Sequence, residues 1–200
     1  MLYAKKPLKI ALTGPPAAGK STLLKVFHML GYPTFSADVV VKRLSRPCQK
    51  GYHRLVQNFG KEILAPSGEL DRQKIMEKML EDQSFKKKLE NILHPLVKEE
   101  LLCWFEKEKD SPALVAEIPL LFQVGWDELF DLVIFLSCPR KILLERLRKR
   151  LKNDKLALAL LENYEKGLPP TINASQIPGD LPSDLLKEKV QEILLKHGLI

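Results

Sequence analysis

Three short runs along the chain are apolar, with little alternation between hydrophobic and polar positions. They cover residues 8–12, 113–118 and 131–136. Runs of this kind are typical of strands that are buried on both faces of a parallel sheet. A shorter strand is predicted at residues 32–36, with Asp38 at its end. Helical segments separate the strands, so the pattern predicts an α/β fold with a parallel central sheet.

The helices are predicted from apolar residues at helical spacing and from the residues that start and stop helices. In chain order the first four cover 21–31, 39–44, 52–59 and 72–81, the last with Asp71 as its cap. The next helix starts near residue 84, is interrupted by His94 and Pro95, and resumes over 96–107. A basic helix begins at Arg140, and a final helix covers 184–196 with Ser183 as its cap. Prolines at 169, 170, 178 and 182 predict a loop-rich zone before the last helix. The helical region 52–107 is long for a simple connection between strands, so part of it is interpreted as a subdomain inserted into a single domain of residues 1–200.

Length and composition fit one globular domain, because the chain has 200 residues, of which 45% are hydrophobic and 28% charged. Its 3 cysteines lie far apart and have neither metal-ligand spacing nor a disulfide pattern, which favours a reducing compartment. No apolar run approaches the length of a membrane span, and the first residues lack the apolar segment of a signal peptide. We therefore expect a cytoplasmic protein with no membrane partner.

The formal net charge is +7, and basic residues concentrate between Arg140 and Lys155. Such an excess fits a nucleic acid, an anionic small substrate or a solvated helix face. No aromatic residues are interleaved with the basic ones, so a platform for stacking nucleic-acid bases is not indicated. A nucleic-acid binder is the weakest of these interpretations, and no nucleic-acid partner is expected.

The segment from Gly14 to Ser21 fits the pattern G-x-x-x-x-G-K-[ST] between a predicted strand and a predicted helix, which is the context of a phosphate-binding loop, or P-loop. Glycines let the backbone wrap a phosphate, whose oxygens then face amide groups and a helix N-terminus. Lys20 can reach the outer phosphates of a bound nucleotide, and the Ser21 hydroxyl can ligate Mg²⁺. The alternative is a chance glycine-rich turn.

Pro15 and Pro16 have no N–H, so the amides from Ala17 to Thr22 are expected to matter most for phosphate binding. The residues expected to bind the nucleotide phosphates are Pro15, Pro16, Ala17, Ala18, Gly19, Lys20, Ser21 and Thr22.

Five further segments follow the P-loop along the chain. They are Ser36-Ala37-Asp38 followed by Arg43, Gly68-Glu69-Leu70-Asp71-Arg72, Leu89-Glu90-Asn91-Ile92-Leu93-His94-Pro95, Ile118-Pro119-Leu120-Leu121-Phe122, and the pair Arg146 and Arg150. In this order, and together with the P-loop, they resemble the dephospho-CoA kinase family over most of the chain. The resemblance implies transfer of a phosphoryl group from ATP to the ribose 3′-hydroxyl of dephospho-CoA, the last step of coenzyme A synthesis. It also implies the three-layer fold of P-loop NTPases, with a helical substrate-binding insert near 52–107 and an arginine lid near 140–155. We expect a monomer or a weak oligomer.

The resemblance assigns the chemistry to Lys20, Asp38 and Arg146. Asp38 matches the family's catalytic base, which would lie beside the acceptor hydroxyl. Taken by itself, an Asp after a strand is more often a helix N-cap. Arg146 and Arg150 are four residues apart and share a helix face, where two guanidiniums can clamp ATP phosphates.

The acceptor substrate is expected to contact Asp38, Arg72, His94 and Leu120. A lone His before a Pro is more often structural, so both interpretations of His94 stay open. Glu117, at the end of a predicted strand, either supports Mg²⁺ or is a solvated or paired carboxylate.

The chain departs from the family pattern at Ser36, where the family has its first Asp, at Gln123 in place of Glu, and at Leu143 in place of Gln. The segment after Arg150 also keeps little of the family's sequence. Two further hypotheses therefore stay open, a P-loop kinase for another small-molecule acceptor and a non-catalytic nucleotide-binding regulator. The presence of the P-loop lysine, the candidate base and both arginines argues against the regulator.

Overall fold

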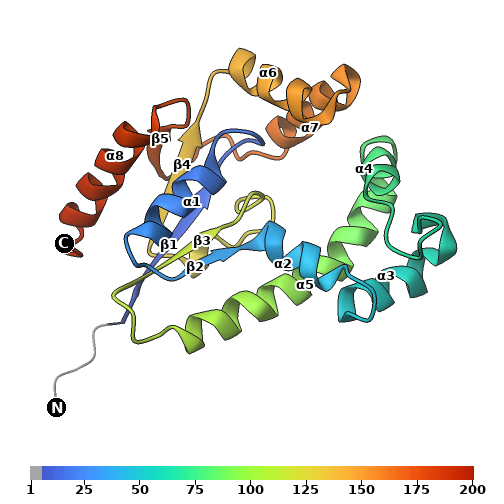
Figure 1. The fold of residues 1–200 in the computed structure, drawn as a ribbon, viewed down its shortest axis with the longest axis horizontal. Helices are drawn as coiled ribbons and strands as arrows, with labels where there is room; N and C mark the ends of the chain where they lie inside the picture. Colours follow the sequence, from blue (N-terminus) through green and yellow to red (C-terminus); the bar gives the residue numbers. More distant parts are fainter. Residues whose placement is uncertain (1–5) are drawn as a thin grey trace. The chain divides into compact units, whose positions relative to one another are not determined.

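The computed structural model describes residues 6–200 (Figure 1), and the chain divides into two compact units. The first runs up to Ser36 and resumes as Trp104–Ile200, and the second is Ala37–Cys103. Each unit has its own hydrophobic core. Within residues 6–200, no helix combines the length and the low polarity that crossing a bilayer requires.

A five-stranded parallel sheet forms the centre of the first unit, in the order β2-β3-β1-β4-β5 (Figure 1). The strands are β1 (Leu8–Thr13), β2 (Thr34–Ser36), β3 (Ala113–Glu117), β4 (Leu132–Ser137) and β5 (Ser175–Pro178). Every residue of β3 is buried, as expected for a strand that is covered on both faces. Because the strands are parallel, their carboxyl ends lie at one edge of the sheet, which is where open α/β sheets bind ligands. The predicted α/β class is confirmed.

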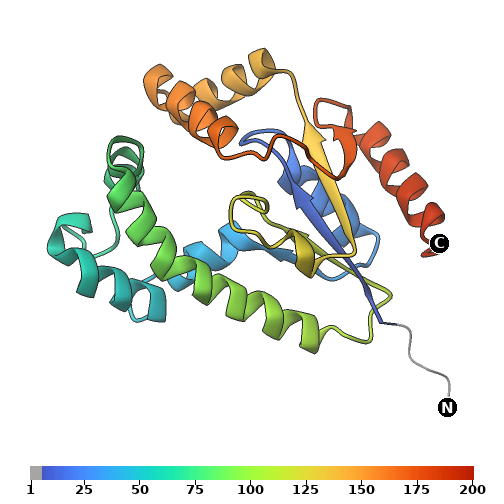
Figure 2. The same cartoon turned by 180° about the vertical axis from the view of Figure 1, so that it is seen from behind.

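Helices cover both faces of this sheet, and Figure 2 gives the view from behind. They are α1 (Lys20–Met29), α6 (Arg140–Leu151), α7 (Asp154–Lys166), α8 (Ser183–Lys196) and the end of α5 (Gln83–Lys107). On one face Phe27 of α1, Leu147 of α6 and Leu194 of α8 are fully buried in a single core cluster. On the other face Phe35 of β2 packs on Trp104 of α5, with ring centroids 5.4 Å apart. The short turn η2 (Asp127–Leu129) leads into β4, and Phe130 after it packs edge-on against Phe105 of α5, with ring centroids 5.6 Å apart.

The second unit is helical. It consists of α2 (Ala37–Leu44), α3 (Lys50–Phe59), the 3-10 turn η1 (Gly60–Ile63), α4 (Arg72–Glu81) and most of α5. Its core gathers around Leu55 and Ile63, which are almost fully buried. The Asp71 side chain accepts a hydrogen bond of 3.0 Å from the amide of Lys74, so the predicted cap of α4 is confirmed. The unit begins earlier, at Ala37, than the helical insert expected from the sequence.

The predicted break at His94 and Pro95 is wrong, because α5 continues through Pro95. Proline has no N–H to donate to the preceding turn, and this loss ordinarily kinks or ends a helix. Here Leu93, Leu96 and Val97 around it are all buried. Tertiary packing of these buried residues stabilises the helix although one main-chain hydrogen bond is missing.

The zone predicted to be loop-rich contains the edge strand β5, which pairs with β4. Only Ile177 of β5 is buried, so the sequence carries too weak a hydrophobic pattern to indicate a strand. The basic helix ends at Leu151, and α7 follows it as a separate helix that the sequence analysis did not predict. Ser183 is also not the cap of α8, because Pro182 is at the N-cap and no side chain caps the first turn.

Candidate functional site

The P-loop joins β1 to α1 at the carboxyl edge of the sheet (Figure 1). Gly14 and Gly19 have φ values of 139° and 101°, and Ala17 also has a positive φ of 65°. A Cβ atom on Gly14 would lie 2.5 Å from the carbonyl oxygen of Leu136 in β4, so no larger residue fits there. The first glycine of the motif is therefore required both by its backbone angle and by close packing on the neighbouring strand.

Lys20 is the first residue of α1, and only 7% of its surface is exposed. Its ammonium group donates to the carbonyl oxygens of Gly14 and Pro15, each at 2.8 Å. The loop is thus closed around a buried positive charge at the N-terminus of a helix, which is an arrangement that attracts anions. The amides of Ala18 and Thr22 donate to loop carbonyls at 3.2 and 2.9 Å, so these two amides already have acceptors within the loop.

Glu117, the last residue of β3, is 3% exposed, and each of its carboxylate oxygens accepts a hydrogen bond from a serine. The Ser21 hydroxyl donates to Oε1 at 2.9 Å, and the Ser36 hydroxyl donates to Oε2 at 3.1 Å. Glu117 is therefore a paired carboxylate and not a solvated one. The contact with Ser21 joins it directly to the P-loop.

Arg146, on α6, is half-buried, and its Nη1 atom donates to two main-chain carbonyls. One belongs to Ala17 of the P-loop at 3.1 Å and the other to Gly179 at 3.2 Å, just after β5. Nη1 also lies 4.0 Å from the sulfur of Cys138, whose pKa is raised by burial. The predicted lid arginine therefore contacts the phosphate-binding loop itself.

Gly179 lies in the zone that the sequence predicts to be loop-rich, and it packs against the P-loop. A Cβ atom at this position would collide with the carbonyl oxygen of Ala18. Its amide donates to Ser137 at 2.6 Å. The Pro178-Gly179 pair was the available signal, and it gives no information about which distant segment the glycine approaches.

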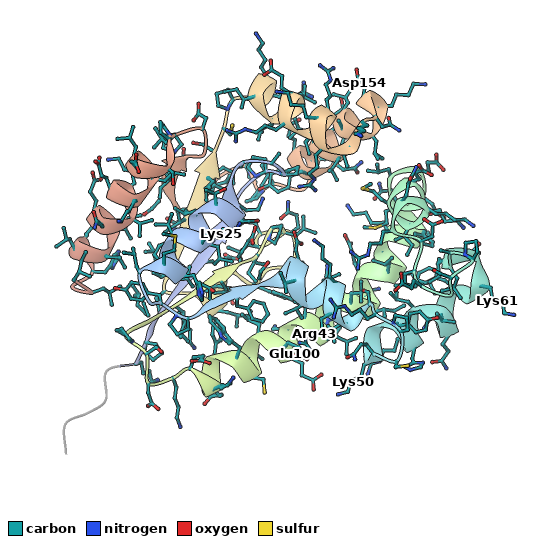
Figure 3. The ribbon with its side chains drawn as sticks, in the orientation of Figure 1. Lys25, Arg43, Lys50, Lys61, Glu100 and Asp154 are labelled. Atoms are coloured by element: carbon teal, nitrogen blue, oxygen red, sulfur yellow. The ribbon has the colours of Figure 1, made fainter. Side chains whose placement is uncertain are left out.

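The other basic residues of α6 are more exposed. Arg150 is exposed at the end of the helix. Arg148 lies 3.6 Å from Asp154, with side chains 50% and 76% exposed, and Figure 3 labels Asp154 at the start of α7. Arg140 pairs with Glu165 at 3.2 Å on the surface. Part of this basic helix is therefore a solvated face with weak surface ion pairs.

Four of the predicted site residues lie outside these contacts. Asp38 is exposed and is the second residue of α2, so it lies within the first turn and not at the N-cap. Arg72 is exposed as the first residue of α4. Burial lowers the pKa of His94 in α5, with a smaller opposite effect from Glu90. Leu120 is half-buried in the turn after β3.

Arg43 belongs to the segment that resembles the family, and it has a structural partner in the second unit. Its guanidinium lies 2.7 Å from the carboxylate of Glu100, and Figure 3 labels both side chains. Both side chains are more than a third exposed, so the pair contributes little to stability.

Gln123 stands at one of the departures from the family pattern, in the turn after β3. Both polar atoms of its amide are buried, and within residues 6–200 they have no hydrogen-bond partner. A Cβ atom on Gly167, just after α7, would lie 2.8 Å from Cγ of Gln123, so this side chain fills the space beside a glycine. Tyr164 on α7 is also buried, and burial raises the pKa of its hydroxyl.

Three features meet at the edge of the parallel sheet. They are the phosphate loop between β1 and α1 with its buried lysine, the buried carboxylate at the end of β3, and an arginine from a later helix. Together they define a P-loop kinase. The family model for dephospho-CoA kinase matches residues 8–162. The chain belongs to the dephospho-CoA kinase family. The family resemblance and the expectation of a phosphotransferase are thereby confirmed.

Individual relatives agree with this membership. The chain is 35% identical over 195 residues to a dephospho-CoA kinase of Bacillus anthracis, a match that covers 96% of this chain and 98% of the relative. It is 36% identical over 147 residues to that of Geobacillus kaustophilus, covering 72% of each.

Solved structures agree as well. Dephospho-CoA kinase from Campylobacter jejuni has a TM-score of 0.63 at 25% identity, covering 96% of this chain and 98% of that one. The protein TT1252 from Thermus thermophilus has a TM-score of 0.76 at 24% identity over the same shares, which supports the fold.

Proposed function

We propose that this chain transfers the γ-phosphoryl group of ATP to the ribose 3′-hydroxyl of dephospho-CoA. One observation carries the proposal: the likeness to the Bacillus anthracis dephospho-CoA kinase covers 96% of the chain. It therefore includes the helical unit Ala37–Cys103 and not only the P-loop, which every P-loop kinase shares. The cytoplasmic location and the monomeric or weakly oligomeric state expected from the sequence stay predictions.

The P-loop and α6 are proposed to bind the triphosphate of ATP. Phosphate oxygens accept from amides at the N-terminus of α1 and from the Lys20 ammonium, which exchanges its carbonyl partners for them. Arg146 and Arg150 neutralise the charge that spreads over the transferring group. Since Nη1 of Arg146 holds the Ala17 and Gly179 carbonyls, Nε and Nη2 are the proposed donors to phosphate.

Two oxygen-bearing side chains fit a magnesium ion beside the loop. Mg²⁺ prefers hard oxygen ligands and is usually bound by one or two carboxylates together with substrate phosphates. The Ser21 hydroxyl and the Glu117 carboxylate are 2.9 Å apart and supply that kind of donor set. Within residues 6–200, no three His, Cys, Asp or Glu side chains gather into a metal site, so the nucleotide would complete the coordination. Ser21 and Glu117 would hold Mg²⁺, which would supply positive charge beside the nucleotide phosphates.

Asp38 is the proposed general base for the acceptor hydroxyl. It is an exposed carboxylate in the first turn of α2, and it follows β2 at the carboxyl edge of the sheet. Arg72, His94 and Leu120 are the proposed contacts for the acceptor. The positive charge of Arg72 suits the phosphates of dephospho-CoA, and a half-buried leucine suits its apolar portions.

The test is a panel of acceptors assayed with ATP and Mg²⁺, in which ADP release is followed and products are identified by mass spectrometry. Dephospho-CoA should be converted to coenzyme A faster than other hydroxyl-bearing acceptors such as adenosine, pantetheine and shikimate. Faster turnover of another acceptor would replace dephospho-CoA as the substrate. Nucleotide binding without ADP release from any acceptor would favour the non-catalytic regulator instead.

A further inference from the structure

Ser36 is a residue of the site to which neither the phosphate loop nor the proposed transfer step assigns a role. It is the last residue of β2, and it pairs in register with Glu117, the last residue of β3. Its hydroxyl donates to Oε2 of Glu117 at 3.1 Å, while Ser21 of the P-loop donates to Oε1 at 2.9 Å. The carboxylate is thus held from both sides by two neutral hydroxyls, and both of its oxygens have a fixed partner.

The sheet makes this arrangement rigid. The backbones of β2 and β3 are hydrogen-bonded side by side, so Ser36 reaches Glu117 without depending on a flexible loop. The preceding residue, Phe35, is 7% exposed and packs on Trp104, which fixes the end of β2. Glu117 itself is 3% exposed, so rotation of its carboxylate would leave a buried oxygen without a donor.

Charge is the second consequence of a serine at this position. Glu117 is the carboxylate that accepts a hydrogen bond from Ser21, and it contributes a single negative charge there. An Asp in place of Ser36, as in the family pattern, would place a second carboxylate next to that of Glu117, on the adjacent strand. Mg²⁺ gives up its water reluctantly, and one carboxylate is a weak site for the free ion, whereas phosphate oxygens add the missing charge and ligands.

We propose that Ser36 is a positioning residue for the divalent cation, and that its neutral hydroxyl makes cation binding at this site depend on bound nucleotide. Ser36 holds Oε2 of Glu117 so that Oε1 stays directed at Ser21, the hydroxyl that ligates the cation. This inference rests on the proposed use of Mg²⁺ with ATP. The competing explanation is that Ser36 only satisfies a buried carboxylate, as buried polar groups generally require.

Cation binding can be measured without turnover by titrating Mn²⁺ and recording the electron paramagnetic resonance signal of the free ion. With ADP present, Ser36→Ala should weaken Mn²⁺ binding about tenfold or more, which is the usual cost of losing a group that orients a metal ligand. Ser36→Thr keeps the hydroxyl and should restore the wild-type affinity. Ser183→Ala removes an exposed serine hydroxyl that caps nothing and should leave the affinity unchanged.

In the absence of nucleotide, a variant that adds a negative charge should bind Mn²⁺ more tightly than the wild type. The wild-type chain should bind Mn²⁺ only weakly, and Ser36→Asp should bind it at least about tenfold more tightly, as expected when a second carboxylate joins the ligand set. Circular dichroism spectra of the variants check that each is folded.

Two results would overturn the proposal: Ser36→Ala binding Mn²⁺ with ADP as tightly as the wild type, or Ser36→Asp gaining no affinity for Mn²⁺ alone. Either result can be separated from a failure of the proposed reaction, because no acceptor substrate is present in these titrations. If dephospho-CoA is not phosphorylated but the Mn²⁺ affinities change as stated, the acceptor assignment is wrong and the role of Ser36 stands.

Discussion

Removing the Arg146 side chain should lower both the stability of the chain and its phosphoryl transfer. The guanidinium donates to the carbonyls of Ala17 at 3.1 Å and Gly179 at 3.2 Å, and thereby ties α6 to the P-loop and to the segment after β5. A hydrogen bond from a charged group contributes about 1.5–3 kcal/mol. Because Arg146 is half-buried and both bonds are long, the lower end applies, and Arg146→Ala should cost about 2–3 kcal/mol in total.

For a chain of 200 residues that loss corresponds to a fall in Tm of about 5–10 °C. Arg148→Ala is the matched control, since it removes an arginine of the same helix whose contact with Asp154 at 3.6 Å is exposed. Its Tm should change by less than about 3 °C, because surface ion pairs contribute less than about 1 kcal/mol. Differential scanning calorimetry of the two variants measures both values.

Transfer should separate the same variants. Arg146→Ala should reduce kcat/KM for ATP-dependent transfer by about a hundredfold or more, as for a lost group that stabilises transition-state charge. Arg150→Ala should also reduce transfer sharply, but with little change in Tm because Arg150 is exposed. Arg148→Ala and Lys149→Ala should have much smaller effects on the rate.

Equal Tm values for Arg146→Ala and Arg148→Ala would refute the structural part of this reasoning. Equal losses of transfer in all four variants would refute the assignment of Arg146 and Arg150 to one functional face. Tight, salt-sensitive binding of DNA or RNA, with transfer unaffected in the Arg146 and Arg150 variants, would instead show that α6 binds a polymer.

Three further predictions concern single residues. Lys20→Ala should reduce transfer to background while the fold survives, because the charge on the outer phosphates is lost; near-normal turnover would exclude the P-loop assignment. Asp38→Asn should lower kcat by about a hundredfold with nucleotide affinity little changed, as for a lost general base, and a normal kcat in rapid-quench assays would leave Asp38 with only a helix-end role. Burial lowers the pKa of His94, so the unfolded chain binds a proton there more readily than the folded chain does. The free energy of unfolding should therefore fall as the pH drops below about 6.5. His94→Asn should flatten that part of the curve of unfolding free energy against pH, measured by urea titration; an unchanged curve would show that His94 does not contribute to it.

The central strands and the P-loop were predictable because their signals are local. Ile10 and Leu12 lie in a run of apolar residues, which is typical of a buried strand. The spacing from Gly14 to Lys20 indicates a backbone that can wrap a phosphate and a positive charge placed beside it. β5 was not predictable, because a strand with one buried residue depends on its neighbour β4 for its hydrogen bonds. Continuity through Pro95 depends on burial, which the local sequence does not specify.

In the site too, residues within one motif could be predicted, whereas contacts between distant segments could not. Lys20 and Ser21 follow from the motif, whereas the Ser36–Glu117 contact requires knowing that β2 and β3 are neighbours. The contact between Arg146 and Gly179 likewise joins two segments far apart in sequence. The family membership predicted from the order of motifs is confirmed, while the individual roles of Asp38 and the acceptor-binding residues stay predictions.

The strand order also has a consequence for how the chain is made. β1 is synthesised first but lies at the centre of the sheet, and its neighbours β3 and β4 come much later. Lys9 on β1 and Asp131 beside β4, joined by a hydrogen bond of 2.8 Å, are 122 residues apart. A nascent chain therefore carries the apolar β1 unpaired while the whole helical unit is translated, and distant pairings of this kind fold slowly and are prone to aggregate. Yield in a recombinant host should consequently depend on growth temperature and chaperone supply during translation more than on the stability of the finished protein.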